Sequence, residues 1–228
     1  MTLNVLDTKA LGTNGVNDAL HLSASKDNTS FKIINPNGAH ALAAGLHQSI
    51  CLEIDGHVGY YCAGMNKNAT ITVNGNAGTG VAENLMSGEV RIKGNASQSA
   101  GASGHGGLLV IEKNASSRCG ISMKGLDIVV KGDVGHMSAF MAQAGNLVIC
   151  GNAGNHLGDS IYEAKIFVKG NCSELGADCI EKDMDSAHIE ELSQLLDRAK
   201  VNENARNFRR YGSARKLYNF NIDNIDQY

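Results

Sequence analysis

The chain has 228 residues, of which 43% are hydrophobic and 19% are charged, and its formal net charge at pH 7 is -3. This composition excludes a disordered chain, and the slightly acidic balance excludes broad electrostatic binding of nucleic acid. Tryptophan is absent and glycine occurs 27 times, so we expect a core of small aliphatic side chains rather than large aromatic ones.

Residues 1–48 have no regular hydrophobic period and are predicted to form an N-terminal cap. Within them, residues 41–46 are expected to belong to a degenerate extra rung of the repeat that follows. The first twelve residues lack the basic and apolar regions of a secretory signal, and no stretch approaches the about 18 apolar residues that cross a membrane. We therefore expect a cytoplasmic protein whose cysteines are reduced thiols.

Residues 49–180 carry an internal repeat with a period of 19 residues, which holds for seven copies without an insertion. In every copy an aliphatic residue stands four positions and two positions before a recurring turn, as Leu52 and Ile54 do in the first copy. Apolar residues spaced by two form the inward face of a short strand. Leucine-rich repeats need a denser leucine signature than these copies have. The repeat therefore predicts an all-β, single-stranded, right-handed parallel β-helix of about seven rungs.

A glycine marks the turn in six copies and is followed mostly by Asn or Asp. We expect glycine here because the turn needs positive φ, which glycine adopts without strain. Lys113 is the departure, and Lys113→Gly should then stabilise the fold by about 1 kcal/mol. The Asn side chains from Asn76 to Asn171 are expected to form hydrogen bonds along the stack. The repeat glycines are Gly56, Gly75, Gly94, Gly132, Gly151 and Gly170.

A second column, seven residues after the turn position, contains only alanine or glycine. A column this small predicts a tight corner or a narrow part of the core. Its members are Ala63, Ala82, Gly101, Gly120, Ala139, Gly158 and Ala177.

Residues 181–228 are predicted to be a C-terminal helix followed by an aromatic and basic tail. Residues 186–200 have the apolar spacing of an amphipathic helix, and Asp185 or Ser186 is expected to cap its start. For residues 201–228 two alternatives stay open: a second helix that folds back on the prism, or an arm that docks a partner chain. A nucleic-acid arm is the weakest alternative.

The outward side of the strands, three residues before the turn position, changes from polar to apolar halfway along the repeat. An exposed aliphatic ladder needs a cover, which the tail or another subunit would supply. We predict a subunit interface here, so that Val129→Lys would weaken complex assembly while the isolated chain still folds. The expected interface residues are Val110, Val129, Val148, Phe167, Phe208, Tyr211 and Tyr218.

Several patterns in the sequence resemble phosphate-binding, metal-binding or catalytic motifs, but the repeat explains them better. Residues 101–107, GASGHGG, lack the preceding strand and following helix of a phosphate-binding loop. No cysteines have the CxxC spacing, and Cys62 and Cys119 lie three rungs apart, about 14 Å, too far for a disulfide. The histidines form no HxxxH or HExxH pair. We predict no catalytic residue, no metal ligand and no cofactor-binding residue in this chain.

Residues 80–116 and 144–170, with their recurring VxGN(A/V)G turns, resemble the glycine-repeat domain that ends the large subunit of glutamate synthase. The resemblance covers about residues 38–185 in register, and residues 209–220 resemble the helical segment after that domain. The same type of repeat occurs in a subunit of formylmethanofuran dehydrogenase. As a separate chain, the sequence is most similar to the glycine-repeat subunit of N-methylglutamate synthase (methylamine–glutamate N-methyltransferase), or to a chain of a split glutamate synthase.

The resemblance implies a β-helix without catalytic residues, which links a glutamine amidotransferase domain to an FMN-binding barrel. For a separate chain it implies a scaffold subunit of a hetero-oligomer, with an amidotransferase-like chain and an FMN-barrel chain as partners. FMN and an iron–sulfur cluster would be held by those partners. The N-terminal Cys nucleophile of a class II amidotransferase has no counterpart at Met1 and Thr2. The alternative is a structural subunit of a formylmethanofuran-type C1 complex, and the choice between ammonia and methylamine stays open.

Overall fold

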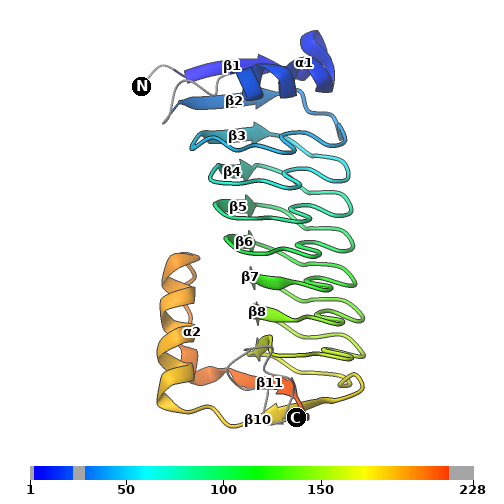
Figure 1. Cartoon of the computed structure of the whole chain (residues 1–228), viewed down its shortest axis with the longest axis vertical. Coiled ribbons are helices and arrows are strands. Elements are labelled where there is room, and N and C mark those ends of the chain that lie inside the picture. Colours follow the sequence, from blue (N-terminus) through cyan, green and yellow to red (C-terminus); the bar gives the residue numbers. More distant parts are fainter. Residues whose placement is uncertain (1–2, 23–28, 216–228) are drawn as a thin grey trace, which may run out of the picture.

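The computed structural model describes residues 3–22 and 29–215. Figure 1 shows a tall prism in which successive coils of the chain stack on one another. Within the described residues, eleven strands form one sheet in the order β1-β2-β3-β4-β5-β6-β7-β8-β9-β11-β10. The predicted parallel β-solenoid is therefore confirmed.

The parallel strands from β1 to β9 form one wall of the prism. From β3 onward, residues pair with the residue 19 positions later, as Leu52 pairs with Ile71 and Ile71 with Val90. A register shift between Lys124 and Asp127 interrupts this pairing in β7. The strands are β1 (Leu3–Asp7), β2 (Ser30–Ile34), β3 (Cys51–Asp55), β4 (Thr70–Val73), β5 (Glu89–Ile92), β6 (Leu108–Ile111), β7 (Lys124–Val130), β8 (Ala144–Ile149) and β9 (Lys165–Val168).

The core of the prism is filled by the two inward columns that the sequence predicts. In β4, for example, Ile71 and Val73 are fully buried, and Val90 and Ile92 continue the same columns in the next coil. Burial of an aliphatic side chain of this size stabilises a fold by roughly 1.5–3 kcal/mol. Because each coil repeats the same two aliphatic positions, the core runs without a break along the stack.

The repeat glycines do not serve the purpose that the sequence suggests. Gly56 has a positive φ of 144°, but Gly75, Gly94, Gly132, Gly151 and Gly170 are not among the residues with positive φ. Instead, a Cβ at any of these five would collide with the backbone or the Asn or Asp side chain of the coil before it. The column is glycine because consecutive turns approach too closely for a side chain. The premise of the Lys113→Gly prediction is therefore wrong, since Lys113 also lacks positive φ.

The stacked polar column beside these glycines forms the hydrogen-bonded ladder that the sequence predicts. Each side-chain oxygen accepts the backbone N–H of the equivalent residue in the next coil, as Asn76 Oδ1 does from Asn95 at 2.8 Å. His57 begins the ladder, because its Nδ1 accepts the N–H of Asn76 at 2.9 Å. The ladder continues through Asn95, Asn114, Asp133, Asn152 and Asn171.

The alanine and glycine column is a tight corner, as predicted. Its backbone is left-handed from Ala63 to Gly158, with φ of 56° at Ala63 and 68° at Gly101, but not at Ala177. In the same corner the residues two positions before and after are also left-handed, as Tyr61 and Met65 are around Ala63. The flanking Tyr61 and Met65 have the same backbone conformation, so conformation alone does not keep the column small. Its residues point into the packed core: Ala63 is fully buried, and a Cβ at Gly101 would collide with Ile128.

The N-terminal segment is more regular than its sequence pattern indicates. Strands β1 and β2 extend the parallel sheet, and helix α1 (Thr8–Leu22) connects them in sequence, with a kink at Gly12. Val16 and Leu20 of α1 are fully buried and cover this end of the core. Residues 41–46 stack on the next coil, because the N–H groups of Ala41 and Gly45 donate to the carbonyls of Tyr60 and Gly64.

The C-terminal segment consists of β10 (Cys179–Lys182), α2 (Ser186–Arg198), the short 3-10 helix η2 (Ala205–Asn207) and β11 (Arg209–Ser213). The amphipathic helix is confirmed, and Asp185 caps it by accepting the N–H of His188 at 2.9 Å. Residues 201–215 fold back on the prism, but as η2 and a strand rather than a long second helix. The helical segment that the resemblance implies over residues 209–220 is wrong for 209–213, where β11 lies antiparallel between β9 and β10. By pairing with β9, β11 provides hydrogen-bond partners for the backbone groups at the edge of β9, which would otherwise be unpaired.

Candidate functional site

The outer face of the sheet carries the column of outward residues for which the sequence predicts a partner interface. We call the residues three positions before the turn the outer ladder: Glu53, Thr72, Arg91, Val110, Val129, Val148 and Phe167. The structure divides this ladder into a lower half that the chain itself covers and an upper half over β1–β4. Arg91 lies at the boundary.

Helix α2 covers the lower half of the outer ladder. Leu192, Leu195 and Leu196 lie on one face of α2, because residues three and four apart in a helix share a face. They form one buried cluster with the four apolar ladder residues and the segment after the helix: Val110, Val129, Val148, Phe167, Ala199, Val201, Ala205 and Phe208.

The predicted subunit interface over these residues is therefore wrong. Val110, Val129, Val148 and Phe167 are fully buried by the same chain, Phe208 packs with them, and Tyr211 of β11 lies in the main core. Tyr218 lies outside the described residues. The sequence left two covers open, the tail (residues 201–228) or another subunit. The structure shows that the leucine face of α2 provides most of the cover, with Val201, Ala205 and Phe208 of the tail beside it.

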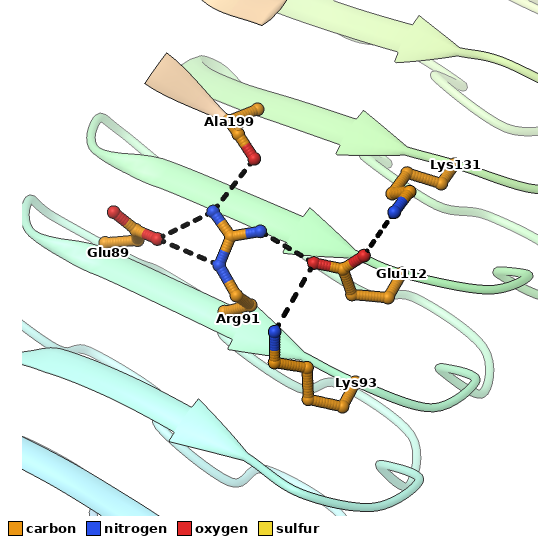
Figure 2. Close-up of polar contacts among 6 residues, drawn as sticks. All are labelled: Glu89, Arg91, Lys93, Glu112, Lys131 and Ala199. Carbon is orange, nitrogen blue, oxygen red and sulfur yellow. Dashed lines mark hydrogen bonds and ion pairs between the residues drawn. The ribbon is translucent and has the colours of Figure 1, made fainter. Parts of the chain in front are cut away.

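Figure 2 shows a cluster of charged side chains where α2 ends, built around the buried guanidinium of Arg91. Arg91 donates to Glu89 Oε1 at 3.0 and 3.2 Å and to Glu112 Oε1 at 2.8 Å. Its Nη2 also donates to the carbonyl of Ala199 at 2.9 Å. A cation is favourable at the C-terminus of a helix, where the last carbonyls lack partners. Arg91 thus fastens the end of α2 to the sheet.

Glu112 links this cluster to two lysines. Lys131 Nζ lies 2.6 Å from Glu112 Oε2, and Lys93 Nζ lies 3.7 Å from Oε1. Partial burial acts to raise the pKa of Glu112, but the hydrogen bonds from Lys131 and Arg91 outweigh it, and the net pKa is lowered. Glu112 is therefore ionised at neutral pH and balances the charge of Arg91, which burial would otherwise make costly.

The upper half of the outer face contains a shallow groove of about 440 Å³. Its lining comes from β1 to β4, and most of the side chains are small or neutral. Cys51 is exposed in this groove, and Leu3 at its end is 52% exposed. The lining residues are Leu3, Ser30, Phe31, Cys51, Leu52, Glu53, Thr70 and Thr72.

The remaining groups that could carry chemistry are buried or scattered. Burial raises the pKa of the Cys62 and Cys119 thiols to about 12, so they stay protonated and unreactive. His136 and His156 meet edge to face, with ring centroids 5.1 Å apart. Over residues 3–22 and 29–215, no group of three or more His, Cys, Asp or Glu side chains could hold a metal ion. In the same residues, no helix is long and apolar enough to cross a membrane.

Sequence reasoning missed the Arg91 cluster and the role of His57. For Arg91 a signal exists, because it is the last polar residue of the outer ladder before the aliphatic run that begins at Val110. For His57 the signal is its position in the column that Asn occupies in later coils.

A known protein matches this chain over nearly its whole length. No protein-family model matches the chain. The chain is 56% identical over 226 residues to Protein GlxC of Rhizobium meliloti (strain 1021), a match that covers 98% of this chain and 99% of that protein. The match therefore spans the residues that form the cap, the solenoid and the covering C-terminal segment of this chain.

Proposed function

Because the chain belongs to the family of Protein GlxC and folds as a continuous β-solenoid, we propose that it is the scaffold subunit of a glutamate synthase-like nitrogen-transfer complex. In this proposal the chain performs no chemistry itself. Its partners are a glutamine-amidotransferase-type chain and an FMN-barrel chain, as in N-methylglutamate synthase or a split glutamate synthase. FMN and any iron–sulfur cluster belong to the partners.

The observation that carries the proposal is the unbroken stack of coils. Strand spacing of about 4.8 Å makes the wall from β1 to β9 about 38 Å long. The aliphatic columns and the ladder from His57 to Asn171 run along this length without a break. Such a body is a rigid spacer that can hold two catalytic chains at a fixed separation. The glycine-repeat domain that the sequence resembles links such catalytic parts in glutamate synthase.

Purification of the tagged full-length chain from its native host, at its natural level of expression, tests the proposal. We expect an amidotransferase-type chain and a flavin-binding chain to be retained in fixed ratio, with FMN detected by its absorbance and released by denaturation. Retention of molybdenum or tungsten together with a formyltransferase would instead identify a C1 complex of the formylmethanofuran type. A chain that stays alone at the concentrations of the cell would contradict both.

A further inference from the structure

The uncovered half of the outer face continues the surface that α2 occupies. The same columns run through both halves, because Glu53 pairs with Thr72 and Thr72 with Arg91 in the parallel sheet. The chain turns back after α2, where Arg91 binds the carbonyl of Ala199. In Figure 1 α2 lies beside the lower strands, and no helix lies beside β3 and β4.

The dimensions of the two halves match. Helix α2 has 13 residues, so it is about 20 Å long. It covers the four apolar ladder residues, which at a strand spacing of about 4.8 Å occupy a similar length. The strands β1–β4 offer the same length of wall, and the small side chains of Ser30, Thr70 and Thr72 in the groove allow a helix to approach closely.

The groove also presents a carboxylate with no cationic partner among the described residues. Glu53 accepts a hydrogen bond from Asn74 Nδ2, whereas its column neighbour Lys32 pairs with Asp55 at 3.4 Å. In the lower half, the carboxylates of Glu89 and Glu112 are both engaged by Arg91. The groove therefore lacks one positive charge, which an occupant could supply.

We propose that the face over β1–β4 docks an amphipathic helix of a partner chain. The helix is about 13 residues long, is aligned end to end with α2 and presents an Arg or Lys to Glu53. This inference rests on the proposed function, because it assigns the surface through which one catalytic subunit is held. A second copy of this chain is a poorer occupant, because its equivalent face would bring another Glu53 carboxylate, and the lysine of that face, Lys32, is paired with Asp55.

Cys51 is a built-in reporter of occupancy, because its thiol is exposed in the groove whereas Cys62 and Cys119 are fully buried. Iodoacetamide should alkylate Cys51 in the isolated chain and react at least tenfold more slowly with it in the purified complex, as followed by mass spectrometry. Cys62 and Cys119 should stay unmodified in both and serve as internal controls. Equal reactivity of Cys51 in both states, or protection that grows with the concentration of the isolated chain alone, would overturn the inference.

Charge reversal supplies an independent test in the same complex. Glu53→Arg should reduce retention of the partner chain at least tenfold, and Thr72→Arg should act similarly by filling the groove. The matched control is Gln98→Arg, at an exposed position in the turn after Ala96, which should retain the partner fully. If the wild-type chain retains the amidotransferase-type and flavin-binding chains and both groove variants retain both of them equally well, the docking site is wrong and the proposed function stands. If the wild-type chain retains no partner, both are wrong.

Discussion

At the scale of single residues, each turn of the solenoid is a coupled pair of a glycine and a polar residue. The oxygen of Asn114 lies where a Cβ of Gly132 would be, and it accepts the N–H of Asp133 at 2.9 Å. Glycine is therefore needed at Gly132 because the Asn114 oxygen and the Lys113 backbone leave no room for a Cβ, whereas the turn at Lys113 accommodates one. The sequence shows that the two columns belong together, but the contact between coils that links them is visible only in the structure.

The clearance at Gly132 can be tested by adding one methyl group. Gly132→Ala should lower the free energy of unfolding by about 1–3 kcal/mol, because the new Cβ must displace Asn114 or the backbone of Lys113. Lys113→Ala is the control, since that turn already accommodates a Cβ, and its stability should change by less than about 0.5 kcal/mol. Denaturant unfolding of both variants checks this, and equal losses would contradict the steric explanation.

The ladder needs an acceptor at its first position, which His57 supplies through Nδ1. His57→Asn should keep this hydrogen bond and leave the melting temperature nearly unchanged. His57→Leu should lose it and cost about 0.5–1.5 kcal/mol, because the N–H of Asn76 must then rely on solvent. Thermal unfolding distinguishes the two variants, and the explanation is wrong if they behave alike.

Glu112 makes the stability of the fold depend on pH. Its pKa in the folded chain lies below the ordinary value of 4.5, so its contribution is present above that value and is lost as the pH falls through the lower, folded pKa. Glu112→Gln should therefore destabilise the chain at pH 7, by about 1–2 kcal/mol. The difference from the wild type should shrink as the pH falls below 4.5 in denaturant titrations. A difference that is independent of pH would exclude an ionic role.

At the scale of elements, the two-residue and 19-residue periods predict the strands from β3 to β9, and the apolar spacing predicts α2. Strand β11 could not be predicted in this way, because it has no place in the repeat register and pairs with β9 and β10 in the opposite direction. The cover of the outer ladder depends on the same long-range return of the chain. Sequence shows that the ladder needs a cover, but the packing of Leu192, Leu195 and Leu196 decides which segment provides it.

Burial of the lower outer ladder changes what a substitution there should do. Val129→Lys places a charge under α2, so it should destabilise the isolated chain by more than about 3 kcal/mol rather than only weaken assembly. Thr72→Lys, in the same column of the uncovered half, should change stability by less than about 0.5 kcal/mol. Circular dichroism melting curves compare the two, and a stable Val129→Lys chain would mean that α2 does not need this contact.

At the scale of the whole molecule, the solenoid is a straight body whose length is set by the number of coils. Its candidate partner surface is the part of the outer face that α2 leaves open. The resemblance to glutamate synthase suggests which partners such a spacer would hold, and the groove over β1–β4 suggests where one of them binds. The proposed function depends above all on a fixed separation of the partners, and the periodic fold makes that separation adjustable in steps of about 4.8 Å.

Addition of one complete coil changes this separation by a single step. A second copy of residues 60–78, inserted after Gly78, keeps the 19-residue register, retains β1–β4 with the groove and lengthens the wall by one strand. The lengthened chain should fold with a β-rich circular dichroism spectrum and a cooperative melting transition. The measurement is the amine-transfer rate of the complete complex, at matched FMN content, with the lengthened chain and with the wild-type chain. We predict at least a tenfold lower rate for the lengthened chain, and an unchanged rate would contradict the role of the solenoid as a spacer.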